Sequence, residues 1–162
     1  MRDLPTRNLL KKIEIFKLIN LKIRIFLLKK IEIILIYQYE FINIMEDYLN
    51  RLQNNDTNLI ELNLFNKNIG DNGAIAISET LKVNTTLQEL NISSNNIGEN
   101  GAIAISEALK VNTCLQILNI SYNKIGENGE IAIKNALQYN YSLKEIYGVD
   151  VGDLFEYVFL FH

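Results

Sequence analysis

Residues 87–114 read LQELNISSNNIGENGAIAISEALKVNTC, and this 28-residue stretch decides the fold because the chain repeats it. Residues 59–86 agree with it at 20 of 28 positions and residues 115–142 at 18 of 28, whereas unrelated sequences would share about two. A partial fourth copy begins at Leu143. A repeat of this length predicts a solenoid, in which each copy forms one structural unit and packs against the next.

Each copy predicts a strand, a turn and a helix, in that order. The opening apolar alternation is typical of a β-strand. The helix is expected to be about eleven residues long, with Ala102, Ile105 and Leu109 on one inward face. Asp71 and its equivalents precede the helix, where they suit a helix cap. Asn112 and its equivalents stand where the helix must end, and we expect them in the left-handed closing conformation.

A pair of glycines separates the strand from the helix in every copy. We interpret it as a tight turn, because glycine tolerates positive φ. The spacing between the two glycines is the same in all three copies, which makes the turn part of the repeating unit. The six residues are Gly70, Gly73, Gly98, Gly101, Gly126 and Gly129.

The combined pattern LxxLxLxxNxIGxxGAxAI, followed by SEALKxN, resembles the ribonuclease-inhibitor class of leucine-rich repeats. Nucleotide-binding immune receptors and the Ran GTPase-activating protein carry repeats of this class. The resemblance covers residues 59 to about 147. It implies an α/β fold, a short leucine-rich-repeat solenoid with parallel strands on the concave face and helices on the convex face.

The resemblance also implies a structural role for one asparagine after each strand. Asn95 and Asn123 occupy this place, where an inward amide can satisfy backbone groups of adjacent loops. The first copy departs from the pattern, with Lys67 between Asn66 and Asn68. Two alternatives follow: the first loop is looser, or a neighbouring asparagine takes over the role.

Four regions are predicted along the chain. Residues 59–142 are three leucine-rich repeats, and residues 45–58 are an N-terminal capping helix and loop. Residues 143–162 are a partial fourth repeat and a C-terminal cap, whose apolar tail could cover the last turn. Residues 1–44 are a basic segment rich in Ile and Lys.

Residues 9–44 contain eleven Ile, six Lys and no Gly, so nothing divides them into turns. Three alternatives are open. The segment forms a long helix, or it lies on an anionic membrane surface, or it is a spuriously translated extension before a true start at Met45. A membrane-spanning helix is not predicted, because the longest charge-free apolar run, residues 33–37, is far below the roughly 18 residues that a bilayer requires.

Charge is unevenly distributed along the chain. Residues 1–44 carry nine basic and four acidic side chains, a net charge of +5. Residues 45–162 carry seven basic and fifteen acidic side chains, a net charge of −8, so the whole chain has a net charge of −3. The acidic repeats lack the stripe of Lys and Arg that binds phosphates, which argues against nucleic acid and suits a basic protein partner better. Cys114 is the only cysteine, so we expect no intramolecular disulfide and an intracellular, cytoplasmic location.

The repeats predict no enzyme activity, no cofactor and no metal site. Ser93 recurs as Ser121, but the sole histidine, His162, lies outside the repeats, so no base can activate these hydroxyls. The repeated GxxG lacks the Lys and Ser/Thr of a phosphate loop. Glutamates recur on the expected helices and strands, where a solvated face or a site for cations or a basic partner are both open; they are Glu61, Glu79, Glu89, Glu107 and Glu145.

The concave face is the predicted interaction surface, because its side chains point away from the helices. Asn63, Asn91 and Asn119 fall in one column with a spacing of about 4.8 Å, and these amides either bond to one another or bind a ligand. Large side chains on a rigid sheet can anchor a partner. The predicted partner-binding residues are Asn63, Phe65, Asn91, Ser93, Ile117, Asn119 and Tyr122.

A repeat that supplies surface but no reactive group predicts a non-enzymatic protein-interaction module. Its concave face and loops would contact a protein whose identity the sequence does not specify. Two alternatives come from other features. The Ran-activating relatives suggest regulation of a small GTPase, and residues 9–44 suggest an adaptor anchored at a membrane surface. The oligomeric state is left open.

Overall fold

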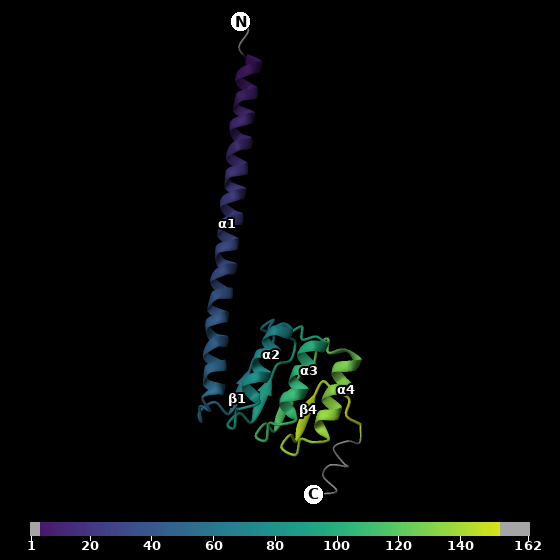
Figure 1. Cartoon of the computed structure of the whole chain (residues 1–162). Helices are drawn as coiled ribbons and strands as arrows, with labels where there is room; N and C mark the ends of the chain where they lie inside the picture. The colour runs from purple at the N-terminus through teal and green to yellow at the C-terminus, as the bar shows by residue number, and fades with distance from the viewer. Residues whose placement is uncertain (1–3, 153–162) are drawn as a thin grey trace. The chain divides into compact units, whose positions relative to one another are not determined.

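The computed structural model describes residues 4–152, and the apolar tail proposed as a cap, residues 155–161, lies outside this range. The described elements alternate between helix and strand along the chain (Figure 1). The chain divides into two units, residues 1–46 and residues 47–162. The elements are α1 (Leu4–Gln53), β1 (Glu61–Asn63), α2 (Gly70–Leu81), β2 (Glu89–Asn91), α3 (Glu99–Leu109), β3 (Ile117–Asn119), α4 (Gly126–Leu137) and β4 (Glu145–Tyr147).

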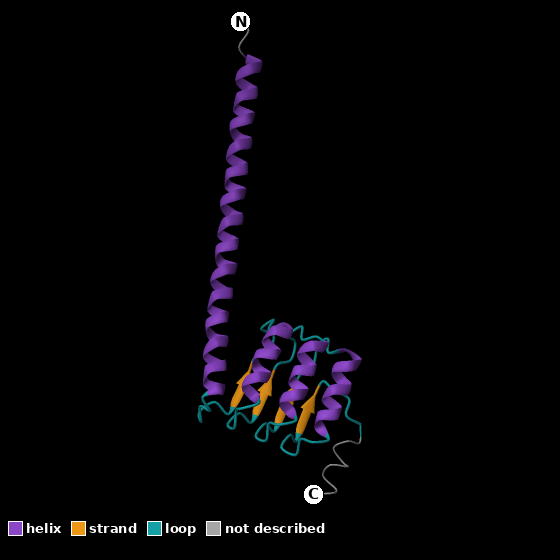
Figure 2. Ribbon diagram, viewed as in Figure 1, coloured by secondary structure: helices purple, strands orange, loops and turns teal. Residues whose placement is uncertain are grey.

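The second unit is a two-layered solenoid. Its four strands are all parallel and lie in chain order, β1-β2-β3-β4. The helices α2, α3 and α4 form a second layer that covers one face of this sheet (Figure 2). The pairing is in register with the repeat, so Leu62 lies beside Leu90 and Leu90 beside Leu118. The predicted fold class, an α/β leucine-rich-repeat solenoid, is therefore confirmed.

The core lies between the two layers and repeats with the sequence. Leu90 in the middle of β2 is buried, as are Ala102, Ile105 and Leu109 on the inward face of α3. The predicted helical face is thus confirmed. β1, β2 and β3 each bury only their central side chain. One copy alone therefore has too little apolar contact to fold, and the stack supplies the rest.

The asparagines at the helix ends do not adopt the left-handed conformation, so that prediction is wrong. Asn112 is instead buried, and its Nδ2 donates to Leu81 O at 2.7 Å and to Asn84 O at 3.0 Å in the preceding repeat. Its Oδ1 accepts hydrogen bonds from the backbone N–H groups of Cys114 and Leu115. The amide satisfies carbonyls that a helix end leaves unpaired, and this links consecutive repeats.

The glycines fit the turn interpretation only in part, because positive φ occurs in two of the three first members and in none of the second members. Gly70 and Gly126 do adopt positive φ, +57° and +66°, but Gly98 is extended, with φ −96°. The second glycine of each pair lies in the first turn of its helix, and in α3 and α4 this glycine, Gly101 or Gly129, lies at the contact with the preceding helix. A Cβ on Gly101 would lie 3.0 Å from Ala74 Cβ, so this position is kept small by helix packing.

A helix of one repeat is also capped by a side chain of the preceding repeat. None of the three repeat helices has a side-chain cap at its own N-cap residue, contrary to prediction. Asp71 in the first turn of α2 accepts hydrogen bonds from Gly98 N at 2.5 Å and Gly101 N at 3.1 Å. Its carboxylate thus caps α3, the helix of the following repeat, where a negative charge also meets the positive end of the helix dipole.

A change of residue type distinguishes the last helix from the two before it. Ala74 and Ala102 are buried where the next helix packs against them. The equivalent residue of α4 is Glu130, which pairs with Lys134 at 2.8 Å, and Lys134 itself stands where α3 carries Ser106. A charged pair on this face prevents a further helix from packing closely, because packing would remove both charges from water.

Restoring the small residues should therefore promote self-association. We expect a Glu130→Ala/Lys134→Ser variant to show a higher weight-average mass than the wild type at the same concentration in sedimentation velocity. The control is Glu107→Ala/Lys110→Ser, which removes an exposed ion pair of α3. Equal sedimentation of wild type and the α4 variant across the concentration range would contradict this role of the pair.

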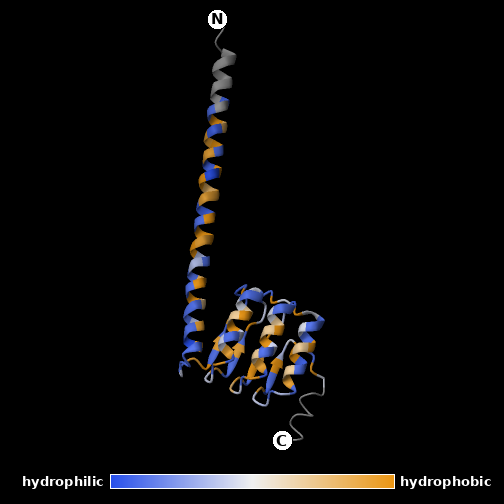
Figure 3. Cartoon of the chain, viewed as in Figure 1, coloured by the Kyte–Doolittle hydropathy of each residue, from blue (hydrophilic) through white to orange (hydrophobic). Residues whose placement is uncertain are grey.

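The first unit consists of the greater part of α1. Apolar and polar residues alternate along it without forming one clear stripe (Figure 3), and its apolar side chains between Ile15 and Ile44 are mostly exposed. The helix fits a segment with no glycine and no proline after Pro5. Within residues 4–152, no helix combines the length and the apolar character needed to cross a bilayer.

Candidate functional site

The open side of the sheet forms a shallow groove of about 220 Å³. The side chains lining it come from all four strands, so its shape depends on the parallel pairing. It brings together four of the predicted residues, the three strand asparagines and Ile117. The lining residues are Glu61, Leu62, Asn63, Glu89, Leu90, Asn91, Ile117, Asn119 and Tyr147.

The three strand asparagines do not bond to one another in the described structure. Each Oδ1 instead accepts a hydrogen bond from the backbone N–H two residues further on. This Asx turn fixes the orientation of each amide and leaves its Nδ2 without a partner among the described residues. The three distances are all 3.0 Å: from Phe65 N to Asn63, from Ser93 N to Asn91, and from Ser121 N to Asn119. The groove thus offers a column of oriented donors.

Ser93 was predicted to contact a partner, and the structure contradicts this. The residue is only 4% exposed, and its Oγ donates to Asn91 Oδ1 at 2.6 Å. A buried hydroxyl already bonded to its own chain offers no surface for binding. Its role is to hold the Asn91 amide in place.

Phe65 and Tyr122 lie in the loops after β1 and β3 rather than on the sheet face where the sequence placed them. Both are exposed, Phe65 by 53% and Tyr122 by 88%. Tyr122 has φ +56°, in line with Asn66 and Ser94 at the equivalent places. A bulky side chain in this conformation costs about 1–2 kcal/mol, so an exposed tyrosine here is a notable candidate for contact with a partner.

Two of the strand glutamates, Glu61 and Glu89, line the groove and are exposed, and Glu145 lies beside it on β4. Glu61 pairs in register with Glu89, and Ile117 lies between Glu89 and Glu145. Tyr147, which was not predicted, closes the asparagine column, and its hydroxyl donates to Glu145. This hydrogen bond to a carboxylate raises the pKa of Tyr147.

The glutamates of the helices have a different environment. Glu79 pairs with Lys82 at 2.7 Å, and Glu107 pairs with Lys110 at 2.5 Å. These pairs are one helical turn apart and exposed, the arrangement of a solvated helix face. They therefore provide a natural comparison for the unpaired glutamates of the groove.

A second asparagine ladder supports the loops beside the groove. Asn95 is buried, and its Nδ2 donates to Leu64 O at 2.7 Å while its Oδ1 accepts from Lys67 N at 2.8 Å. Asn123 repeats this one unit later, with Nδ2 3.0 Å from Ile92 O. Each amide serves the loop of the preceding copy. The first copy has no preceding loop of this kind, which explains why Lys67 is tolerated there.

The loop of the first copy is consequently not left without support. Asn95 bonds to it, and neither neighbouring asparagine takes over the ladder role. Asn66 and Asn68 instead supply positive φ, +54° and +55°, which Asn adopts more readily than most residues.

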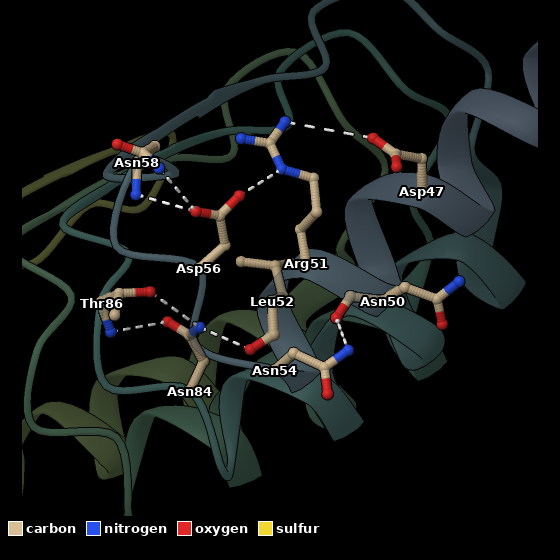
Figure 4. Close-up of polar contacts among 9 residues, drawn as sticks. All are labelled: Asp47, Asn50, Arg51, Leu52, Asn54, Asp56, Asn58, Asn84 and Thr86. Carbon is tan, nitrogen blue, oxygen red and sulfur yellow. Dashed lines mark hydrogen bonds and ion pairs between the residues drawn. The ribbon is translucent and has the colours of Figure 1, made fainter.

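The asparagine ladder at the helix ends begins with the end of α1 (Figure 4). Asn84 Nδ2 donates to Leu52 O at 2.7 Å, as Asn112 does to Leu81 one repeat later. Arg51 Nε bonds to Asp56 Oδ2 at 2.7 Å. The backbone N–H of Asn58 and then the Arg51 guanidinium lower the pKa of Asp56. Residues 47–58 thus make the contacts of a preceding repeat, and their treatment as a capping region stays a prediction.

Cys114 contacts the asparagine ladder at the helix ends. Its thiol is half-buried, and its single proton is shared between two carbonyl acceptors, Leu87 O at 3.2 Å from Sγ and Asn84 O at 3.3 Å. Burial raises the pKa of this thiol, which disfavours the thiolate. Among the residues that the structure describes, His, Cys, Asp and Glu do not gather into groups of three that could hold a metal ion.

One strand per repeat, parallel pairing and asparagine ladders between repeats define a leucine-rich-repeat protein. Comparison with known proteins makes this more specific. Residues 41–151 match the family described as the TMOD/LMOD leucine-rich domain, and the chain belongs to this family. The ribonuclease-inhibitor subtype stays a prediction.

Solved structures also resemble the chain, and two of them bear on its fold and family. One, titled Leiomodin-1 Actin-Binding Site 2 (ABS2), is 27% identical with a TM-score of 0.62, and the match covers 71% of this chain and 70% of that one. The other is the tropomodulin C-terminal domain from Caenorhabditis elegans, 18% identical with a TM-score of 0.52, with 72% and 93% covered. The second supports the fold alone. No curated protein matches the chain.

Proposed function

We propose that residues 47–162 form a non-enzymatic module that binds actin. The observation that carries this proposal is the match to the TMOD/LMOD leucine-rich domain together with 27% identity to a structure titled as an actin-binding site. The geometry is consistent with it, because the unit presents a rigid open face and exposed loops. The repeats contain no histidine that could activate a serine or cysteine as a nucleophile.

The contact surface in this proposal is the groove together with the loops beyond it. Asn91 contributes an oriented amide donor, and Phe65 and Tyr122 contribute exposed aromatic rings. Aromatic side chains on a rigid support are the usual anchors of protein interfaces. Ladder amides hold the residues just before Phe65 and Tyr122, since Asn95 Nδ2 donates to Leu64 O and Asn123 Nδ2 to Ser121 O. Little ordering of these loops would therefore be required on binding.

A triple variant tests this surface. We expect Phe65→Ala/Asn91→Ala/Tyr122→Ala to bind actin at least about tenfold more weakly than the wild type, a loss of about 1.4 kcal/mol. Co-sedimentation with actin filaments and fluorescence titration of monomeric actin would measure it. Circular dichroism would check that the variant remains folded.

The matched control is Asn100→Ala/Val111→Ala/Tyr139→Ala, which removes an exposed asparagine, an apolar side chain and a tyrosine from α3 and from the loops after α3 and α4. It should bind as the wild type does. Equal binding by the groove variant and the wild type would remove the three residues from the proposal. Failure of the wild type to bind either form of actin would overturn the proposal itself.

A further inference from the structure

Two acidic residues that line the groove have no partner in the described structure. Glu61 and Glu89 are exposed and make neither an ion pair nor a side-chain hydrogen bond within residues 4–152. Glu145 lies beside the groove, next to Ile117 in the strand register, and accepts a hydrogen bond only from Tyr147. The residues lining the groove include no lysine or arginine. Its charge is therefore complementary to a basic segment.

The order of the side chains along the groove restricts the shape of that segment. The in-register pairing places Glu61, Glu89, Ile117 and Glu145 in one row across the four strands. With adjacent strands about 4.8 Å apart, the four lie at about 0, 4.8, 9.6 and 14.4 Å along the row. The row thus has two acids, an apolar gap and a third acid.

A helix lying along this row matches the spacing, and an extended chain does not. At a rise of 1.5 Å per residue, helix positions i, i+3, i+7 and i+10 fall at about 0, 4.5, 10.5 and 15 Å and share one face. Alternate residues of an extended chain advance by about 6.8 Å, so only its first and third contacts would lie near an acid. The spacing therefore favours a helix.

We propose that the groove binds an amphipathic helix of another protein that has Lys or Arg at i, i+3 and i+10 and an apolar residue at i+7. The basic residues pair with Glu61, Glu89 and Glu145, and the apolar residue contacts Ile117. The neighbouring asparagine amides donate to polar side chains on the flank of the same helix. This inference rests on the proposed function only in assigning protein binding to this face.

The basic helix of the chain itself does not fit this description. Lys and Arg residues occur throughout residues 1–44, but no two of them are three positions apart in the sequence. Pairing with both Glu61 and Glu89 requires that spacing. The occupant is therefore a different protein rather than α1 of a second copy.

Labelled peptides test the proposal directly on the full chain. The first probe is an alanine-based helical peptide with Lys at i, i+3 and i+10 and Leu at i+7. The second has the same composition with the lysines moved to i+1, i+5 and i+9. Fluorescence anisotropy at low salt should show at least tenfold tighter binding of the first. Equal affinity for the two would overturn the proposal.

Substitutions in the groove give an independent measurement. Glu61→Gln/Glu89→Gln/Glu145→Gln should weaken binding of the first peptide at least tenfold. The control, Glu79→Gln/Glu107→Gln/Glu127→Gln, makes the same change of net charge with exposed helix residues and should change it less than twofold. An equal loss in both variants would show attraction by net charge alone and would overturn the site.

A change of specificity tests the row itself. Ile117→Glu makes the row acidic throughout, so a peptide with Lys at i+7 should now bind better than the one with Leu, reversing the wild-type order. An unchanged order would overturn the assignment of Ile117. Actin binding measured on the same proteins separates the two proposals. Selective peptide binding without actin binding would support the helix-binding groove and overturn the actin-binding function. Actin binding without peptide selectivity would overturn the helix-binding groove and leave the actin-binding function standing.

Discussion

An Asn112→Ala variant should lose about 3–5 kcal/mol of the free energy of unfolding of residues 47–162. The substitution removes an amide that bonds to Leu81 O and Asn84 O and to the N–H groups of Cys114 and Leu115. Asn112 is 4% exposed, so water replaces these bonds poorly. Each buried backbone group left unpaired costs about 1–3 kcal/mol.

Urea unfolding followed by circular dichroism would measure this loss. Since a domain of this size has a stability of about 5–15 kcal/mol, the variant should be partly unfolded at moderate temperature. The control is Asn100→Ala, which removes an exposed asparagine from α3 of the same repeat. It should change the free energy of unfolding by less than about 0.5 kcal/mol. If both variants unfold at the same urea concentration, the ladder does not contribute as inferred.

A Gly101→Val variant should be destabilised by about 3 kcal/mol, because the side chain would occupy the contact between α2 and α3. A Cβ there would lie 2.7 Å from Ile97 Cγ2, 2.8 Å from Asp71 Oδ1 and 3.0 Å from Ala74 Cβ. The two helices must separate or the Asp71 cap must break, and overpacking of this kind typically costs about 1–3 kcal/mol or more. Loss of the cap adds to it.

Gly70→Asn distinguishes this steric effect from the general effect of replacing a glycine. Gly70 has φ +57° with open space around it, and Asn66 and Asn68 already adopt positive φ in the same loop. This variant should stay within about 1 kcal/mol of the wild type by differential scanning calorimetry. A Gly101→Val protein that melts at the wild-type temperature would show that the helices are not in the close contact described.

Sequence reasoning located the repeating elements well, because their signals are local. Leu90 lies in an apolar alternation and Ile105 and Leu109 in a helical spacing, and both patterns require burial of one face whatever the neighbours are. The strands and helices of the repeats consequently formed where the pattern predicted them. For residues 9–44, which contain no turn residues, a long helix was only one of three alternatives, and the structure has α1 over this segment.

The candidate site was predicted only in part. Asn63, Asn91 and Asn119 do lie in one column of the groove, because strand alternation alone determines which side chains point away from the helices. Ser93 was assigned to the same surface but lies beyond the strand end, where the backbone turns and its side chain is buried. Tyr147 was missed because β4 belongs to the divergent fourth copy.

The sequence by itself determined the repeating unit, its length and the in-register stacking that an exact period enforces. Only the tertiary structure decided which bonds cross between units: Asn112 reaches carbonyls 28 and 31 positions away, and Asp71 caps a helix 27 positions on. It also decided that Glu61, Glu89, Ile117 and Glu145 form one row. The physical reason is that apolar periodicity acts within one element, whereas a hydrogen bond or a charged row depends on where two distant side chains point once the strands have paired.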